Sequence, residues 1–180
     1  MATTTLMSFA DFERLEQGAD HIELLKGELI RVPPAKRRHN ETAERLCDLL
    51  KAAIGRVRQE NPAAVFGAAY HEMGYELSRD PGTWLQPDVS VTHPDQGGDD
   101  YYLGAPLLAF EVVSGSESAQ TLDEKVIEYL ANGAAEVWLI YPNQRHAWVY
   151  SGTPVAARRE TRSIHTELLP GIEIPFDEIL

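Results

Sequence analysis

The sequence contains a single cysteine, Cys47, among 180 residues. One cysteine excludes an intramolecular disulfide and a zinc site built from cysteines. The sequence also has no apolar run close to the roughly 20 residues that a membrane-spanning helix needs. Its first residues show neither the basic segment nor the apolar block of a signal peptide. We therefore expect a cytoplasmic protein with no membrane partner.

Positive charge is scarce. Lysine and arginine number 16 against 28 aspartates and glutamates, so the net charge is -12. This balance argues against a protein that binds nucleic acid through a generally basic surface. Local basic patches are still available, although a solvated helix face or loop is the better explanation of each of them alone. The candidates are Lys36-Arg37-Arg38-His39, Arg56 with Arg58, and Arg158-Arg159 with Arg162.

The remaining composition is ordinary for a globular protein, with 43% hydrophobic and 24% charged residues. Together with the length, this predicts one domain over residues 1–180. A capping box at Ser8–Asp11 predicts a short helix to about Gln17. Residues 40–59 carry apolar side chains at helical spacing, which predicts an amphipathic helix. A second capping box, Thr121–Glu124, predicts a helix that ends near Asn132.

Strand patterns fill much of the rest of the chain. Residues 21–32 predict a hairpin around Lys26-Gly27, and residues 107–141 predict a strand–helix–strand unit with parallel strands. The fold class predicted is α/β with a mixed sheet. Further strands are expected at 63–70, 85–91, 136–142 and 146–151 and within 166–176, with a polar turn near 78–82 and an acidic loop over 93–104.

Two acids lie at unusual places in apolar segments. Asp88 follows Pro87, which interrupts a strand ladder, so a turn aspartate at a strand start is the simplest explanation. Glu111 lies inside the apolar strand LLAFEVVS. A buried carboxylate costs several kcal/mol unless it is paired, so Glu111 needs either a buried cationic partner or a metal ion.

Lys125 is the third residue of interest, because it flanks the apolar stripe of the helix that follows Glu111. It can extend outward to solvent, or it can reach back toward the strand that carries Glu111. Two carboxylates with a nearby lysine are typical of a metal-dependent phosphodiester hydrolase. The carboxylates hold Mg²⁺, which activates a water and polarises the phosphate, and the lysine positions or helps to deprotonate that water and offsets developing charge.

The order of these motifs resembles the Uma2 family, also called DUF820, within the PD-(D/E)XK nuclease superfamily. The resemblance runs along nearly the whole chain. It implies a restriction-endonuclease-like core, that is, a mixed central β-sheet flanked by helices. The matching segments are IELLKGELI, His39, QPDVSV, GAPLLAFEVVSGS, DEKVIEYLANGAAEVWLIYP and LLPGIEIPFDEIL.

The resemblance also implies roles for individual residues. Asp88, Glu111 and Lys125 are the expected catalytic residues, and Asp88, Glu111 and the backbone carbonyl of Val112 are the expected metal ligands. Many members of the superfamily carry the lysine two residues after the acid, where this chain has Val113. Lys125 on the following helix matches the family's alternative position for the lysine.

Four further residues have weaker assignments. Glu23 is expected to be an auxiliary metal ligand, and Glu28 shares its face of the hairpin. A polar hairpin face explains Glu28 equally well. His39 is a candidate for phosphate contact or helix capping, and Ser114 for a hydrogen bond within the loop after the strand.

The leading functional hypothesis is a DNA endonuclease that uses Mg²⁺, with Mn²⁺ as an alternative. It would bind DNA through a local basic surface and form a homodimer. The alternative is a weak or inactive nuclease fold that binds nucleic acid or a protein partner. A third hypothesis is a structural dimer with exposed aromatics such as Trp84, Tyr101 and Tyr102 at its interface, although buried aromatics are commoner.

Overall fold

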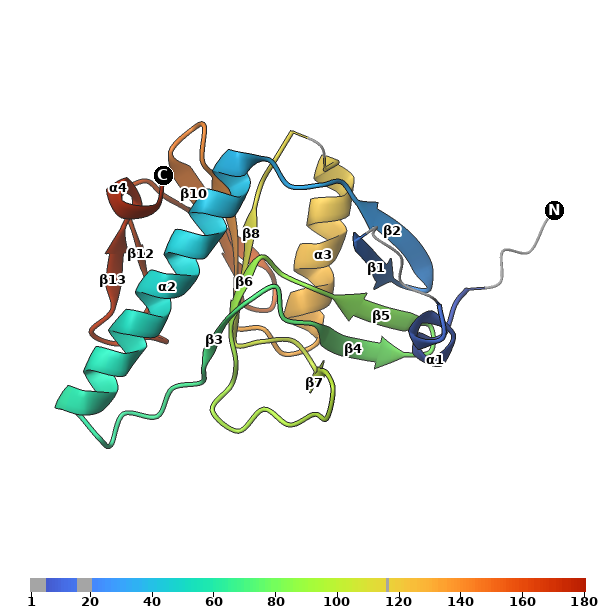
Figure 1. The fold of residues 1–180 in the computed structure, drawn as a ribbon, viewed down its shortest axis with the longest axis horizontal. Helices are drawn as coiled ribbons and strands as arrows, with labels where there is room; N and C mark the ends of the chain where they lie inside the picture. Colours follow the sequence, from blue (N-terminus) through green and yellow to red (C-terminus); the bar gives the residue numbers. More distant parts are fainter. Residues whose placement is uncertain (1–5, 16–20, 116) are drawn as a thin grey trace.

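The computed structural model describes residues 6–15, 21–115 and 117–180 (Figure 1). Within these ranges no helix is both long and apolar enough to cross a membrane. The helices are α1 (Phe9–Glu13), α2 (Arg37–Glu60), α3 (Ala119–Ala131) and α4 (Phe176–Ile179). The strands are β1 (His21–Leu25), β2 (Glu28–Val32), β3 (Ala69–His71), β4 (Tyr75–Arg79), β5 (Gly82–Leu85), β6 (Val89–Val91), β7 (Tyr102–Leu103), β8 (Leu108–Val112), β9 (Glu136–Tyr141), β10 (His146–Ser151), β11 (Ala156–Glu160), β12 (Ser163–His165) and β13 (Glu173–Pro175).

Two sheets and two long helices form the body of the molecule. One sheet has the order β2-β1-β5-β4-β7 and the other β11-β10-β9-β8-β6-β3, while β12 and β13 form a separate ribbon. In the six-stranded sheet β8 is parallel to β9 and antiparallel to β6. The predicted α/β class, the mixed sheet and the parallel strand–helix–strand unit are therefore confirmed.

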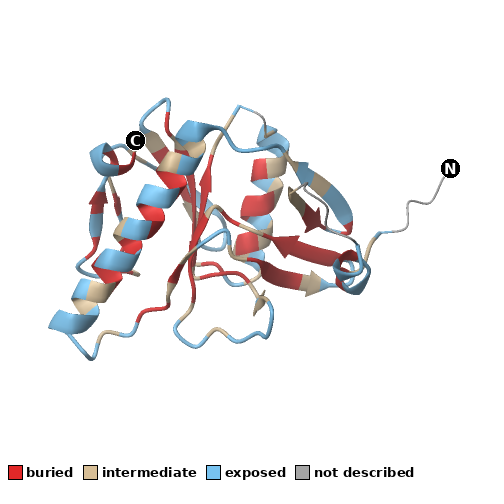
Figure 2. Cartoon of the chain, in the orientation of Figure 1, coloured by how far each residue is buried: buried red, intermediate tan, exposed pale blue. Residues whose placement is uncertain are grey.

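The two long helices pack on different surfaces. Side chains of α2, such as Leu46 and Leu50, cover one face of the six-stranded sheet. Leu122 and Val126 of α3 pack with residues of both sheets, so α3 lies between the sheets. Figure 2 shows the resulting pattern on α2, where buried and exposed residues alternate along the helix.

The helix starts differ in part from the predictions. Ser8 caps α1 as predicted, because its hydroxyl accepts from Asp11 N; the predicted end near Gln17 lies outside the described residues. The α3 prediction was three residues off, because Ser118 is the N-cap and its Oγ accepts from Thr121 N at 3.0 Å. α2 also begins earlier than expected, at Arg37.

Several strand predictions were wrong in extent. The segment 63–68 is not a strand, since Arg58 binds the Phe66 and Gly67 carbonyls and the Thr92 hydroxyl accepts from Ala68 N. The predicted strand 85–91 is broken into the last residue of β5 and the whole of β6. The strands β4, β7, β11 and β12 were not predicted as separate elements.

The hairpin of β1 and β2 has the predicted turn. Lys26 and Gly27 both have positive φ, 53° and 80°, which is the geometry of a tight two-residue hairpin loop. The register pairs Glu23 with Ile30 and Leu25 with Glu28, so Glu23 and Glu28 do share a face. The hairpin thereby fixes which side of β1 carries Glu23.

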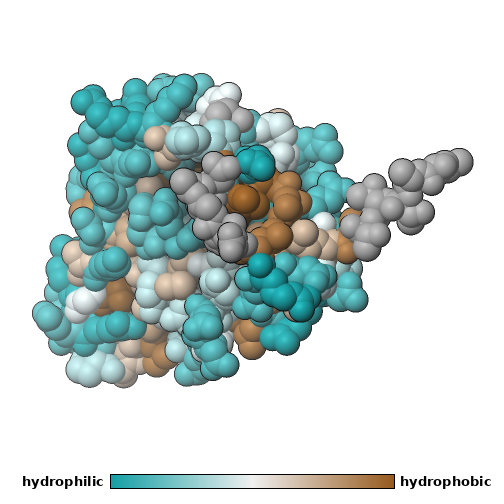
Figure 3. Space-filling view, turned by 45° about the vertical axis from the view of Figure 1, so that its right-hand side comes forward, coloured by the Kyte–Doolittle hydropathy of each residue, from teal (hydrophilic) through white to brown (hydrophobic). Residues whose placement is uncertain are grey.

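The aromatic side chains do not form an exposed interface. Trp84 is 4% exposed and packs against Phe12 and Tyr101, which contradicts its proposed exposure. Tyr102 is half-buried and stacks on Tyr75. On the face seen in Figure 3, hydrophilic side chains predominate, in keeping with the high charge of the sequence.

Candidate active site

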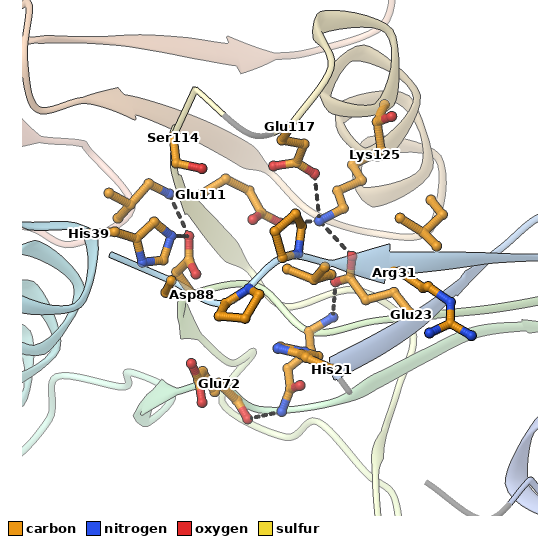
Figure 4. A pocket seen from close by; sticks show the side chains of 18 of the residues that line it. His21, Glu23, Arg31, His39, Glu72, Asp88, Glu111, Ser114, Glu117 and Lys125 are labelled. Atoms are coloured by element: carbon orange, nitrogen blue, oxygen red, sulfur yellow. Dashed lines mark hydrogen bonds and ion pairs between the residues drawn. The ribbon is translucent and has the colours of Figure 1, made fainter. Parts of the chain in front are cut away.

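A pocket of about 470 Å³ lies where the two sheets meet (Figure 4). Its walls come from the β1–β2 hairpin, the first turn of α2, the end of β8 and the first half of α3. Asp88, Glu111 and Lys125, the three predicted catalytic residues, all line it. Residues that are far apart in the sequence therefore meet in one place.

Asp88 lies in the short segment that leads from β5 in one sheet to β6 in the other. Pro87 lacks a backbone N–H and cannot continue a ladder there. The Asp88 carboxylate accepts a hydrogen bond from Val112 N at 2.6 Å, and His39 Nε2 lies 3.2 Å from the same oxygen, Oδ2. These contacts fix Asp88 against the strand that carries Glu111.

The pKa of His39 reflects this contact. Burial lowers it, but the hydrogen bond and the negative charge of Asp88 outweigh burial and raise the pKa above its ordinary value. When it is protonated, His39 offsets part of the Asp88 charge. The placement supports a role beside the acid rather than a simple helix cap, because α2 has Lys36 at its N-cap position.

Glu111 points toward α3. It alternates with Phe110 and Val112, which pack on the α2 side of the sheet. Glu111 is 5% exposed, and its Oε1 accepts a hydrogen bond from Tyr129 OH at 3.0 Å. Burial raises the pKa of Glu111 well above its usual value; Lys125 opposes this rise, and the neighbouring carboxylates add to it.

Lys125 reaches back toward the sheet and does not extend to solvent, since it is 3% exposed. Its Nζ lies 2.6 Å from Glu23 Oε2, 3.1 Å from Glu117 Oε1 and 3.9 Å from Glu111 Oε1. Burial lowers the pKa of Lys125, but the three carboxylates outweigh burial and raise it well above its ordinary value. The group is therefore an ammonium at neutral pH.

Glu23 links the hairpin to the other parts of the pocket. Its Oε2 pairs with Lys125, and its Oε1 accepts from Gln86 N at 2.9 Å. Both carboxylate oxygens thus contact protein groups. In this arrangement Glu23 holds the lysine and the chain just before Asp88.

Glu117 is a residue of the pocket that the sequence reasoning missed. It lies in the loop between β8 and α3, one residue before the N-cap, and pairs with Lys125. Helical spacing could not identify it, because Glu117 lies before the start of α3 at Ala119. Its pairing with Lys125 depends on the path of the loop between β8 and α3.

Comparison with known proteins identifies the family of this chain. The Uma2 family model, described as "Putative restriction endonuclease", matches residues 9–177. The chain belongs to the Uma2 family. The resemblance drawn from the motifs is therefore confirmed. A search of curated proteins found no match.

A solved structure shows that the Uma2 fold is shared. The chain is similar to "a putative nuclease belonging to DUF820" from Anabaena variabilis ATCC 29413, with a TM-score of 0.80 and 15% identity. The similarity covers 96% of this chain and 97% of the other. At this level of identity the match shows the fold, and it confirms the predicted nuclease-like core.

The remaining predicted residues of the Uma2 site fall into two groups. His39, Ser114 and Val112 line the pocket, with the Val112 N–H already bound to Asp88. Glu28 is exposed and does not contribute to the pocket wall. Val113, in the position where many superfamily members have lysine, is partly buried against the core around α3.

The donor atoms in this pocket fit a hard cation. Among residues 6–15, 21–115 and 117–180, no group of three or more His, Cys, Asp and Glu side chains is arranged to hold a metal ion. Mg²⁺, however, is usually bound by one or two carboxylates together with waters and substrate oxygens. Acidic side chains outnumber lysine and arginine in the lining of the pocket, and this excess of negative charge favours a divalent cation. The acids are Glu23, Glu72, Asp88, Glu111 and Glu117, against Arg31 and Lys125.

The candidate basic patches differ in their surroundings. Arg58 binds backbone carbonyls, and Arg158 pairs with Glu136 and Glu160, so the charge of these arginines is used within the fold. The segment Lys36–His39 begins α2, and His39 lines the pocket. Of the three patches, this segment is the one placed beside the site.

Proposed function

We propose that this Uma2 protein is a metal-dependent endodeoxyribonuclease that hydrolyses DNA phosphodiester bonds with Mg²⁺, or Mn²⁺ in its place. The observation that carries the proposal is the meeting of Asp88, Glu111 and Lys125 in one pocket, although they come from a sheet crossover, a strand and a helix. Membership of a family described as restriction endonucleases supports the same reaction.

Asp88, Glu111 and the Val112 carbonyl would hold the cation. When bound, the cation supplies a Lewis acid and lowers the pKa of a coordinated water. The Val112 N–H and His39 keep the Asp88 carboxylate in place. Glu111 contributes the second negative charge from the neighbouring strand.

Lys125 would act through the positive charge of its ammonium group and not as a general base. Three carboxylates hold it in the ammonium form, so it does not accept a proton at neutral pH. An ammonium at this place would orient the attacking water and stabilise charge on the phosphate in the transition state. Glu23 and Glu117 fix its position from two sides.

DNA would approach along the start of α2. Lys36 and Arg37 are exposed next to the pocket, and the helix begins there without a side-chain cap. Such a basic segment binds backbone phosphates without sequence preference. A homodimer would present two pockets to one duplex, which suits double-strand cleavage.

The test is nicking of supercoiled plasmid with Mg²⁺ or Mn²⁺. Asp88→Ala, Glu111→Ala and Lys125→Ala are expected to lower the rate by roughly 10²-fold or more, since each removes a charge that acts on the phosphate. Asp123→Ala is the matched control, because Asp123 is an exposed acid on α3 outside the pocket wall. Equal nicking by all five proteins would overturn the assignment to this pocket.

The same experiment distinguishes the alternative of a nuclease fold that only binds. Gel-shift assays would then show that the parent binds DNA, and plasmid would remain intact at every metal concentration. That outcome would favour the binding module, and loss of DNA binding in Lys36→Ala with Arg37→Ala would locate the DNA on the start of α2.

A further inference from the structure

Tyr129 is buried beside the site and is not a residue that the predicted motif contains. It is 0% exposed, and its hydroxyl donates to Glu111 Oε1 at 3.0 Å. It lies on α3 four residues after Lys125, so the two side chains project from the same helix face. Lys125 Nζ lies 3.9 Å from the same oxygen of Glu111.

The Tyr129 hydroxyl and Lys125 Nζ, both from α3, thus lie close to the same oxygen of the Glu111 carboxylate. The hydrogen bond from Tyr129 and the ion-pair contact of Lys125 Nζ both fall on Oε1 of Glu111. This arrangement leaves Oε2 as the oxygen to bind a cation, and it sets the rotation of the carboxylate about its terminal bond. Glu111 would then bind the metal through one oxygen rather than two.

We propose that Tyr129 is a positioning residue that fixes the Glu111 carboxylate for metal binding. The proposal rests on the proposed function, because it concerns the same metal site. Hydrogen bonds from neighbouring groups to a metal-binding carboxylate orient it, and their loss typically lowers metal affinity or activity about 10- to 100-fold.

The chemistry of the hydroxyl suits this role. A phenol is protonated at neutral pH, so the Tyr129 hydroxyl is available as a donor to Glu111. A tyrosine hydroxyl also adds no charge, and it therefore orients Glu111 without competing with the cation as a second ammonium would.

Tyr75 provides a matched control. It is also 0% exposed, and its hydroxyl donates to Ser90 Oγ at 2.7 Å. It belongs to the same core as Tyr129, but its partner Ser90 does not line the pocket, whereas Glu111 does. Tyr75→Phe and Tyr129→Phe therefore each delete one buried, hydrogen-bonded hydroxyl, and only Tyr129→Phe removes a contact to Glu111.

The experiment is calorimetric titration of Mn²⁺ and Mg²⁺ into the parent, Tyr129→Phe and Tyr75→Phe, with urea unfolding of each protein as a check of stability. Tyr129→Phe is expected to bind metal about 10- to 100-fold more weakly. Tyr75→Phe should match the parent. In nicking assays Tyr129→Phe should lower kcat at saturating DNA and leave KM for DNA nearly unchanged.

Each outcome has a clear meaning. Equal metal affinity of the two phenylalanine variants would overturn the role of Tyr129 while leaving the proposed function intact. A parent that binds no metal would overturn the proposed function, and the role of Tyr129 with it.

A folding defect in Tyr129→Phe is handled by a second background. In Glu111→Met the acceptor of the hydroxyl is gone, so adding Tyr129→Phe should there cost no more stability than Tyr75→Phe does. A specific loss of stability that persists in this background would show a purely structural hydroxyl and overturn the proposal.

Discussion

At the scale of single residues, the pocket is a cluster of charges that depend on one another. Lys125 is surrounded by Glu23, Glu111 and Glu117, and almost no solvent reaches it. Removing one partner of a buried ion pair leaves the others desolvated and unpaired. The stability of the fold and the composition of the site are therefore coupled at this lysine.

Lys125→Met tests that coupling. The change keeps most of the side-chain volume and removes the ammonium, so we expect a loss of roughly 3–5 kcal/mol in the free energy of unfolding, measured in urea. Lys26→Met is the matched control, because Lys26 is half-exposed and pairs with Glu128 at 3.2 Å. Its expected loss is below about 1 kcal/mol. Similar losses in the two variants would contradict the coupling.

The sequence was sufficient for part of this cluster. Glu111 is a carboxylate in an apolar strand and needs a partner, and Lys125 is within reach one short loop later; both arguments are local. Glu117 and Tyr129 could not be assigned in the same way. Their contacts depend on where α3 begins and how it rotates against β8, and those are decided by packing between the two sheets.

At the scale of elements, α3 places both Lys125 and Tyr129, so its first turn sets the geometry of the site. The N-cap is Ser118, and the predicted capping box at Thr121 begins three residues late. Thr121 instead donates a hydrogen bond from its backbone N–H to Ser118 Oγ, at a distance of 3.0 Å.

The cap can be located by substitution. Ser118→Ala is expected to lower the free energy of unfolding by about 1 kcal/mol, and Ser118→Gly by only a few tenths, because glycine is tolerated at an N-cap. Thr121→Ala should have a smaller effect than Ser118→Ala, since the Thr121 hydroxyl caps no backbone group. Thermal unfolding with constant buffer and salt measures all three. A larger loss of stability in Thr121→Ala than in Ser118→Ala would support Thr121 as the N-cap, as the sequence predicted.

Elements with a long periodic pattern were predictable, and elements made by pairing were not. The stripe of α2 and the turn at Lys26-Gly27 are encoded locally. The segment 63–68 has the composition of a strand, yet its backbone groups bind Arg58 and Thr92, which no local pattern reveals. In the same way, the sequence indicated an interruption of the strand at Pro87. It did not indicate that the chain passes there from the sheet of β5 to the sheet of β6.

At the scale of the whole molecule, negative charge is in excess both in the pocket and over the chain, whose net charge is -12. Self-repulsion of this kind destabilises a compact state, and a specifically bound cation relieves it where the charges are closest. Binding to the folded state alone also stabilises by mass action.

Magnesium should therefore stabilise the parent against unfolding. At a concentration of 100 times Kd the expected gain is about 2.7 kcal/mol, seen as a rise in Tm. Asp88→Ala should lose this gain and Asp123→Ala should keep it. NaCl at equal ionic strength serves as the blank, because general screening also reduces repulsion. A rise of the same size in Asp88→Ala would assign the effect to screening.

The crossing of the chain at Gln86–Asp88 has a mechanical consequence. This short segment joins the two sheets covalently. Glu23 on the hairpin accepts a hydrogen bond from Gln86 N, and Asp88 accepts one from Val112 N of β8. The residues of the pocket therefore belong to both sheets, on either side of this connecting segment. A small change in the angle between the sheets would alter the separation of Asp88 from Glu111 and of Glu23 from Lys125 together. The geometry of the site therefore depends on how the two sheets pack against each other.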